Sequence, residues 1–209
     1  MKKVTIVDYG TSNLKSINAA FNYLGHPTLV TNDKQKILNS DLLVFPGVGS
    51  FPVVMKYLVK QNLDTCIKRY IDMNKPFLGI CLGMQVLFEC SYEFKKTKGL
   101  AILEGSVNNL MDKNPTKKLL IPNTGWIPLK KNKLFKKKNL ISIGKNMNFF
   151  FTHSFFAKPK NKHLISSYIE FGKEKICSSV QYNNVIGMQF HPEKSGNIGL
   201  NLLKEFCNL

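Results

Sequence analysis

The chain has 209 residues, 44% of them hydrophobic, which is enough to bury a sizeable core and too many for a disordered chain. Its net charge is +17, but among its 30 basic residues Arg69 is the single arginine, so it offers little bidentate phosphate recognition and we do not expect a nucleic-acid partner. No apolar run is long enough to span a membrane or to serve as a signal peptide, which leads us to expect a cytoplasmic protein.

Short β-type runs and helical patterns alternate in the first half of the chain. A helix is expected with Ser12 as its N-cap, an apolar face that includes Ile17 and Phe21, and Gly25 as its stop. A helical stretch is expected over about residues 53–73, and the next helix begins within residues 84–90. The alternation favours an α/β fold with a mostly parallel sheet and helices on both faces. The predicted strands are Val4–Asp8, Pro27–Thr31, Asp41–Gly47 and Lys75–Ile80.

After about residue 99 short β-type runs replace the helical patterns, which predicts mixed or antiparallel strands packed around the first sheet. The lysine-rich run Lys130–Lys138 is interpreted as a solvated hairpin or loop, and a last helix is expected over Gly196–Cys207. No repeat or linker interrupts the chain, so residues 1–209 are expected to form one domain. The strands expected in this half lie within residues 105–111, 117–122, 140–144, 148–156, 163–171, 175–182 and 185–190.

Cysteine usage singles out one position. The five cysteines are irregularly spaced without a Cys-x-x-Cys pair, so neither a zinc site nor a disulfide framework is expected. Cys81 differs from the others because Gly79 and Gly83 flank it where a predicted strand meets a helix. A nucleophile on so tight a turn needs glycines where side chains would clash, and the helix start offers N–H groups to a thiolate and to an oxyanion. We therefore interpret Cys81 as a nucleophile and the other four cysteines as buried thiols.

A thiol nucleophile needs a base, and the base needs a group that orients it. His191 follows the predicted strand over residues 185–190, and Glu193 lies two residues further along. An extended backbone would put both side chains on one face, so the carboxylate could hold one imidazole nitrogen while the other faces the thiol.

A third stretch, Phe45–Phe51, runs from a buried strand into a loop with Gly47 and Gly49, whose backbone N–H groups could complete an oxyanion hole. Together PGVGSF, GICLGMQ and QFHPEKS resemble the class I glutamine amidotransferase family. Within it, IVDYGTSNLKSI, IPNTGW and FFFTHSF resemble the glutaminase subunits of imidazole glycerol phosphate synthase. The resemblance covers essentially the whole chain.

This resemblance implies a single-domain class I glutamine amidotransferase fold that hydrolyses L-glutamine to glutamate and ammonia. It implies a γ-glutamyl thioester on Cys81, proton transfer by His191, and a Glu193 carboxylate that holds His191. Gln85 would help to hold the α-amino or α-carboxylate end of the substrate. No metal or organic cofactor is implied. The residues implied to lie near the oxyanion or the substrate are Gly47, Gly49, Leu82, Gln85, His153 and Ser154.

The resemblance also implies a partner, a (β/α)₈-barrel synthase subunit that forms a heterodimer with the glutaminase and switches it on. By this resemblance, ammonia would reach the barrel through an internal channel and would be used to make imidazole glycerol phosphate in histidine biosynthesis. Asn123, Trp126 and Lys194 are the expected interface residues, with a core tryptophan as an equally good interpretation of Trp126.

One segment departs from the family pattern. Pro122–Ile127 reads PNTGWI where members usually read PHMGWN. Because the resemblance implies that this segment lies towards the partner, the alternative is a glutaminase that serves a sugar amidotransferase acting on nucleotide-linked or surface-polysaccharide sugars. A cysteine peptidase has no reason to carry PGVG and HPEKS together, and an inactive subunit would be expected to lack Cys81, His191 or Glu193.

Overall fold

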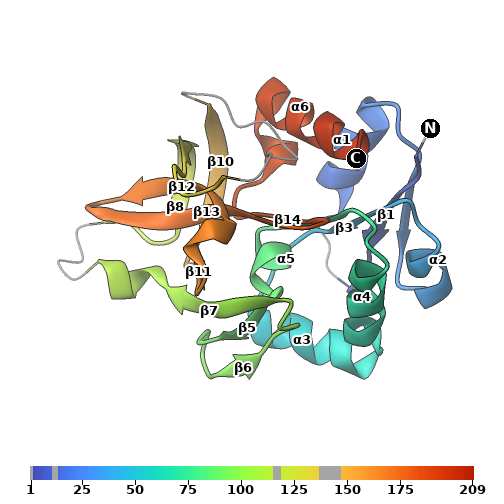
Figure 1. The fold of residues 1–209 in the computed structure, drawn as a ribbon, viewed down its shortest axis with the longest axis horizontal. Helices are drawn as coiled ribbons and strands as arrows, with labels where there is room; N and C mark the ends of the chain where they lie inside the picture. Colours follow the sequence, from blue (N-terminus) through green and yellow to red (C-terminus); the bar gives the residue numbers. More distant parts are fainter. Residues whose placement is uncertain (1, 11–13, 115–118, 137–146) are drawn as a thin grey trace.

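The computed structural model describes residues 2–10, 14–114, 119–136 and 147–209. An eight-stranded sheet crosses the middle of the molecule in the order β2-β1-β3-β4-β14-β13-β12-β9 (Figure 1). Strands β2 (Thr28–Thr31), β1 (Val4–Val7), β3 (Leu42–Phe45), β4 (Phe77–Ile80) and β14 (Val185–Met188) are parallel. Strands β13 (Glu174–Tyr182), β12 (Ile165–Phe171) and β9 (Lys130–Lys131) extend the sheet with antiparallel pairings.

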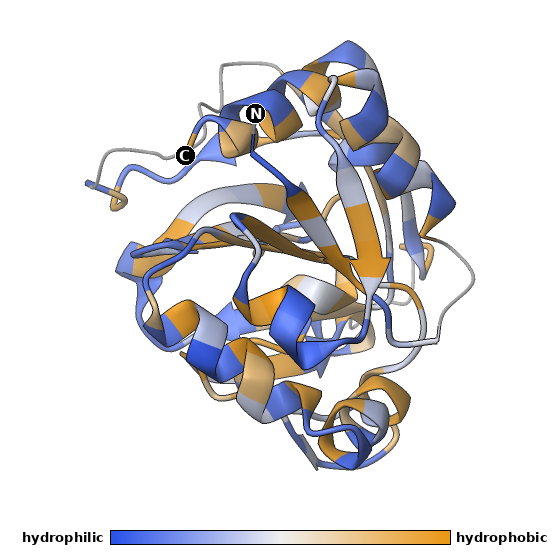
Figure 2. Ribbon diagram, turned by 90° about the vertical axis from the view of Figure 1, so that its right-hand side faces the viewer, coloured by the Kyte–Doolittle hydropathy of each residue, from blue (hydrophilic) through white to orange (hydrophobic). Residues whose placement is uncertain are grey.

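Helices cover both faces of this sheet. Helices α1 (Lys15–Tyr23) and α6 (Gly196–Cys207) pack on one face, and α2 (Lys34–Leu38), α3 (Phe51–Lys60) and α4 (Leu63–Asp72) pack on the other. Strand β3 shows why both faces are apolar: Leu42 and Val44 join the core under α1 and α6, while Leu43 and Phe45 join the opposite core. Figure 2 shows the central strands coloured mainly as hydrophobic and the helices carrying both colours.

Two smaller sheets stand beside the main one. One has the order β11-β7-β5-β6, and the other pairs β10 with β8. The chain passes from β10 to β11 at Ser154, which places this turn between the two small sheets. Their bounds are β5 (Phe88–Ser91), β6 (Thr97–Lys98), β7 (Leu103–Asn109), β8 (Asn123–Pro128), β10 (Asn148–His153) and β11 (Phe155–Pro159). Short helices are α5 (Leu82–Gln85) and the 3₁₀ turns η1 (Leu110–Lys113), η2 (Lys162–Leu164) and η3 (Pro192–Lys194).

The alternating first half and the last helix agree with the sequence-based expectations. All four predicted strands form, α6 has the predicted bounds, and Gly25 follows α1 with a φ of 81°, as a helix stop requires. The proposed N-cap Ser12 lies outside the described residues.

The helical stretch expected over residues 53–73 forms, but as two helices, because the chain breaks between α3 and α4. Asn62 adopts the left-handed conformation with a φ of 55°, which asparagine tolerates better than most residues. The apolar stripe continues on both sides of this break, so the periodicity gave no sign of it. The N–H of Asn62 donates to the carbonyl of Val59 at 3.1 Å and closes the first helix.

The helix expected within residues 84–90 is wrong for most of its length. Helix α5 is one turn long, and Phe88–Ser91 forms strand β5. The cause is tertiary, because β5 pairs with β7 and with β6.

Strands in the second half form largely as expected, with three differences. Residues 148–156 make two strands in different sheets, because the chain turns at Ser154. The described part of the run over residues 117–122 is irregular, and strand β8 begins after it; the run over residues 140–144 lies outside the described residues. Within the described part of the lysine-rich run, Lys130–Lys131 forms the edge strand β9.

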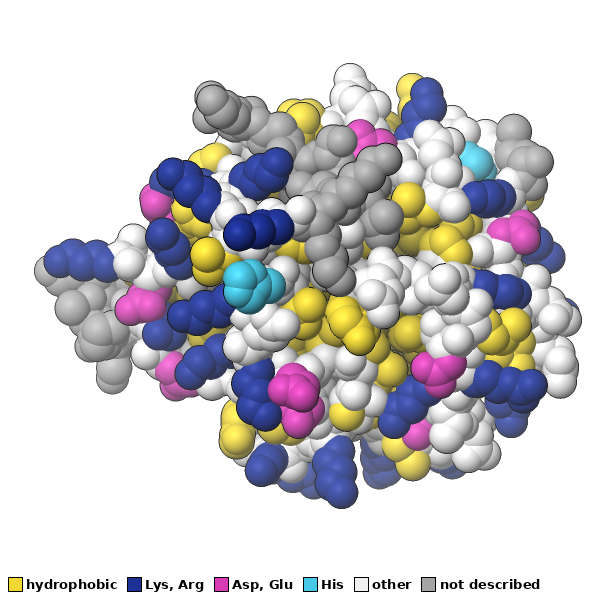
Figure 3. All heavy atoms as spheres, in the orientation of Figure 1, with side chains coloured by type: hydrophobic (Ala, Val, Ile, Leu, Met, Phe, Trp, Pro, Cys, Tyr) yellow, Lys and Arg dark blue, Asp and Glu magenta, His cyan; other side chains and the backbone are white. Residues whose placement is uncertain are grey.

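Within the described ranges, no helix combines the length and the apolar composition needed to cross a bilayer. On the face shown in Figure 3, lysine and arginine side chains are spread from one side of the view to the other, with acidic side chains between them.

Candidate active site

Cys81 sits on a strained turn between β4 and α5. Its φ of 53° and ψ of −108° lie in a region that non-glycine residues rarely adopt. The flanking glycines are needed for packing, because a Cβ on Gly79 would overlap the carbonyl of Gly83, and one on Gly83 would overlap the carbonyl of Phe45. The expected elbow geometry is therefore present, and it places Cys81 at the N-terminus of α5.

Gly47 belongs to the same close packing. A Cβ at this position would overlap the backbone nitrogens of both Leu82 and Gly83 at the start of α5. Glycine thus leaves space beside these two N–H groups. Gly49 lies on the other side of Val48 with a φ of 113°, and nothing lies within 4 Å of the place that a Cβ would occupy.

His191 and Glu193 meet directly. Nδ1 of His191 lies 2.8 Å from Oε1 of Glu193, and the two side chains are only 3% and 8% exposed. The contact was expected, but the backbone is not extended, because Pro192–Lys194 forms the 3₁₀ turn η3. Oε2 of Glu193 is buried and has no hydrogen-bond partner among the described residues. The contact with His191 is therefore what offsets the cost of burying this carboxylate.

The electrostatics of His191 favour the imidazolium. Burial opposes its charge, but hydrogen bonding to Cys81 and Glu193 and the negative charges of both outweigh that effect and raise the pKa of His191 to about 10. Proton transfer from the thiol would leave a thiolate beside a charged imidazole, the pairing that activates a cysteine nucleophile.

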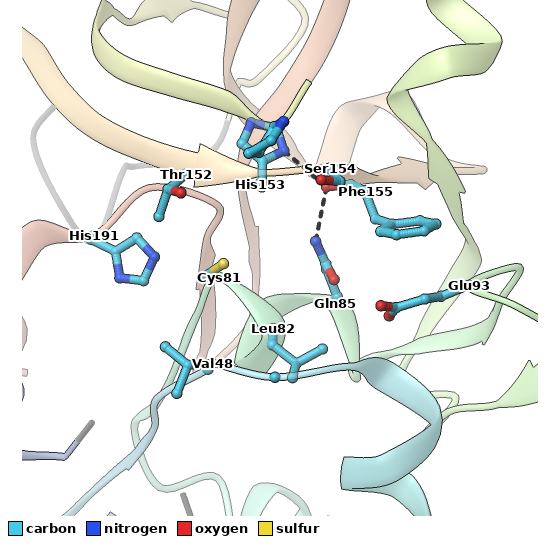
Figure 4. Close-up of a pocket in the computed structure, with 13 residues that line it drawn as sticks. Val48, Cys81, Leu82, Gln85, Glu93, Thr152, His153, Ser154, Phe155 and His191 are labelled. Atoms are coloured by element: carbon cyan, nitrogen blue, oxygen red, sulfur yellow. Dashed lines mark hydrogen bonds between the residues drawn. The ribbon is translucent and has the colours of Figure 1, made fainter. Parts of the chain in front are cut away.

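A cavity of about 260 Å³ opens in front of Cys81. In Figure 4 the Cys81 side chain lies between His191 and Gln85, with Glu93 beyond Gln85. This volume suits a small polar substrate rather than a folded chain. The cavity is lined by Gly47, Val48, Gly49, Cys81, Leu82, Gln85, Glu93, Pro122, Thr152, His153, Ser154, Phe155 and His191.

The loop of Gly47 and Gly49 is tied to Tyr9. The Tyr9 hydroxyl accepts the N–H of Val48 at 3.0 Å and donates to the carbonyl of Pro46 at 2.9 Å, while its ring stacks on Phe45 with centroids 4.9 Å apart. The Val48 N–H is thus engaged by a side chain and does not serve the cavity in this conformation.

His153 is held as a neutral ring. Its Nδ1 lies 2.8 Å from the carbonyl of Phe155, which can only accept, so Nδ1 carries the proton and Nε2 accepts from Nδ2 of Asn123 at 3.1 Å. Burial lowers the pKa of His153 to about 4, helped by the charge of His191 and opposed by the hydrogen bond to Phe155. Asn123, expected at a partner interface, therefore also orients a residue of the cavity wall.

A family model described as glutamine amidotransferase class-I matches residues 5–208. The chain belongs to this family. This amidotransferase is 43% identical to the imidazole glycerol phosphate synthase subunit HisH of Lactococcus lactis, over 99% of the chain and 98% of the relative. It is 41% identical to the subunit of the same name from Aquifex aeolicus, over 98% of the chain and 95% of the relative.

Solved structures of low sequence identity share the amidotransferase fold. The structure of PurLQS from Thermotoga maritima aligns with a TM-score of 0.73 and 19% identity, covering 100% of this chain and 99% of that one. A crystal structure of a glutamine amidotransferase aligns with a TM-score of 0.73 and 14% identity, covering 98% and 97%. Both support the α/β architecture expected from the strand and helix pattern.

The structure brings nine of the predicted site residues together, and the three expected interface residues are not among those that line the cavity. Trp126 is 57% exposed and contacts Phe150 edge-on with centroids 6.1 Å apart, so it is not a core residue. Lys194 is half-buried in η3. The nine that meet are Gly47, Gly49, Cys81, Leu82, Gln85, His153, Ser154, His191 and Glu193.

Sequence reasoning missed several residues of the amidotransferase site. Glu93 lines the cavity, and its carboxylate accepts the N–H of Phe51 at 2.7 Å; burial raises the pKa of Glu93, and that hydrogen bond offsets part of the rise. Gln189 contacts Cys81, and Tyr9 contacts Val48. The other lining residues that were not predicted are Val48, Pro122, Thr152 and Phe155. A usable signal for Gln189 was present in the sequence, because it lies two residues before His191 in QFHPE. There was no such signal for Glu93, because only the fold brings this residue to the cavity.

Proposed function

We propose that this chain is the glutaminase subunit of an imidazole glycerol phosphate synthase, hydrolysing L-glutamine through Cys81 and passing ammonia to a synthase subunit. The observation that carries the proposal is the Cys81–His191–Glu193 arrangement at the floor of a cavity of about 260 Å³. The names of the relatives at 43% and 41% identity support the pathway.

In the first half of the proposed reaction, the Cys81 thiolate attacks the side-chain carbonyl carbon of glutamine and forms a C–S bond. The C–N bond of the resulting tetrahedral intermediate then breaks, and the leaving nitrogen takes the proton of the His191 imidazolium as ammonia departs. The His191 pKa near 10 keeps this proton in place before the step.

In the second half, neutral His191 takes a proton from water, and the hydroxide attacks the thioester carbonyl. Collapse of this intermediate breaks the C–S bond, releases glutamate and returns the thiolate and the imidazolium. Glu193 keeps the imidazole oriented throughout, through the 2.8 Å contact with Nδ1.

Both intermediates carry an oxyanion that needs hydrogen-bond donors. We propose the N–H of Leu82 as the first donor, because Gly47 leaves space beside it. The N–H of Val48 is the second, once its peptide turns away from Tyr9. Gly47 forms one side of that peptide and gives it backbone freedom to turn, and Gly49 follows Val48 in the same loop.

The amino-acid end of glutamine brings an ammonium and a carboxylate into the cavity. Glu93 is the acidic side chain that lines it, which suits the α-ammonium. We propose that Gln85 and Ser154, on the same walls, provide polar contacts to this end of the substrate.

We propose a (β/α)₈-barrel synthase as the partner, in a heterodimer with this chain. Ammonia released into water would protonate and diffuse away, so the product must pass directly to the second enzyme. Asn123, Trp126 and Lys194 are proposed to contact the partner; the exposed Trp126 supports this, since aromatic side chains dominate binding hot spots.

The test compares glutamine hydrolysis by the free chain, by the chain with a histidine-pathway cyclase subunit, and by the chain with a sugar amidotransferase, each with its acceptor. We expect a poor free enzyme and activation by the cyclase subunit. Activation by the sugar enzyme alone would replace the proposed partner and explain the changed Asn123–Thr124 pair. High activity of the free chain would contradict the need for a partner.

A further inference from the structure

Gln189 is a fully buried polar side chain that reaches the proposed nucleophile. Its Nε2 lies 3.5 Å from Sγ of Cys81, and its Oε1 accepts from Nε2 of Gln85 at 3.0 Å. The acid–base steps described above do not use it. A buried amide that contacts a reactive sulfur therefore still needs an explanation.

A backbone carbonyl fixes the direction of both amides. The carbonyl of Phe155 can only accept, so Gln85 must present its NH₂ group there, at 3.0 Å. The second N–H of that nitrogen points at Gln189, whose facing atom must then be the oxygen. The NH₂ group of Gln189 is left to face the sulfur, which consequently has a hydrogen-bond donor beside it.

A donor beside sulfur favours the thiolate, because the anion is the stronger acceptor. We infer that Gln189 is a positioning residue that stabilises the Cys81 sulfur as a thiolate and fixes its direction in the cavity. The inference deepens the proposed glutaminase mechanism and rests on it for the role of Cys81. Since the amides end at Gln85 and Phe155, the sulfur is tied to a wall of the substrate cavity.

Other polar side chains near the sulfur are titratable, whereas Gln189 is not. His191 with its partner Glu193, His153 from β10 and Glu93 from the loop after β5 are the titratable side chains around the cavity. Replacing Gln189 removes a hydrogen bond and leaves these groups in place. Its contribution can therefore be separated from that of the imidazolium.

Two substitutions remove the donor in different ways. Gln189→Met keeps the length of the side chain without an amide, and Gln189→Glu keeps the acceptor that Gln85 needs. Gln181→Met is the matched control, because Gln181 is a buried glutamine of β13, 6% exposed and not among the residues that line the cavity. Its loss reports the effect of removing a buried amide elsewhere.

The measurement is the rate at which iodoacetamide alkylates Cys81, followed against pH by mass spectrometry of the Cys81 peptide in the full chain without glutamine. We expect the pH of half-maximal rate to rise by about one unit or more in Gln189→Met, the size expected for loss of a hydrogen bond to a charged group. In Gln189→Glu the rise also includes repulsion between the new carboxylate and the thiolate, so Gln189→Met is the deciding variant. Gln181→Met should leave this midpoint unchanged while lowering the Tm.

An unchanged midpoint in a folded Gln189 variant would overturn the inference. If both variants fail to fold, the wild-type chain decides: a glutamine side-chain NH₂ signal must shift over the pH range of Cys81 alkylation and stop doing so in Cys81→Ala. A spectrum without such a signal would overturn it equally. Failure of the glutaminase proposal is a separate result, namely no glutamine hydrolysis by the wild type with any partner.

Discussion

Replacing Tyr9 by phenylalanine tests the proposal that the Val48 N–H turns towards Cys81 and donates to the oxyanion. The ring would stay stacked on Phe45, and the hydroxyl that accepts the Val48 N–H at 3.0 Å would be lost. That hydrogen bond must break before the Gly47–Val48 peptide can turn its N–H towards Cys81. A bond of this kind contributes about 1 kcal/mol net, so its absence should raise the population of the turned peptide about five-fold.

We therefore expect Tyr9→Phe to raise the kcat of glutamine hydrolysis by the free chain about five-fold, with little change in KM. The partner-saturated rate should change much less, because a partner that activates the enzyme already favours the turned peptide. The assay measures kcat and KM with and without the synthase subunit and its acceptor.

Tyr70→Phe is the matched control. Tyr70 is fully buried, and its hydroxyl donates to the carbonyls of Asp41 and Pro76 at 3.2 and 3.1 Å, outside the cavity. This variant should lose stability without a change in the free-chain rate. A folded Tyr9→Phe variant that is slower than the wild type with and without partner would refute the reasoning. The Tyr9 hydroxyl would then stabilise the catalytically active conformation of the loop of Gly47 and Gly49.

Two further predictions concern the histidines. His191→Asn should cost more partner-activated kcat than Glu193→Gln, because the first removes a proton carrier, which typically contributes ~10²–10⁴-fold, and the second loosens its orientation; equal, small losses would point to another base. The pKa of His153 is about 4 in the folded chain against an ordinary 6.5. As the pH falls, His153 is therefore protonated in the unfolded chain before it is protonated in the folded chain. The contribution of neutral His153 to the free energy of unfolding should be complete above pH 6.5 and should be lost as the pH falls to 4. The Tm of His153→Gln should therefore change less between pH 6.5 and pH 4 than the Tm of the wild type, and an equal change in both would contradict this.

The elbow and its partners could be predicted because their signals are local. Gly79 and Gly83 mark places where backbone touches backbone, and the structure shows overlaps for any side chain there. His191 and Glu193 are two residues apart, so their meeting depends on one turn. The parallel strands could be predicted for a similar reason, since each is a short apolar run with both faces buried.

The missed features depend on contacts that are distant in sequence. Gln85 and Gln189 are 104 residues apart, and Glu93 meets Phe51 across 42 residues, so neither contact has a local pattern. The helix break at Asn62 was missed for a different reason, because a left-handed asparagine interrupts the backbone and leaves the apolar stripe intact. Strand β5 formed where a helix was expected because pairing with β7 outweighs local preference.

Covalent labelling of Cys81 is the measurement that tests the central claim most directly. A thiol-directed glutamine analogue such as a diazo-ketone should label Cys81 alone, and Cys81→Ser should abolish glutamine hydrolysis while the fold persists. Three of the other four cysteines are buried as expected, and burial raises the pKa of Cys66, Cys177 and Cys207. Cys90 was also expected to be buried, but it is only half-buried. Stoichiometric labelling of Cys66 or Cys177, or hydrolysis that survives Cys81→Ser, would contradict the account.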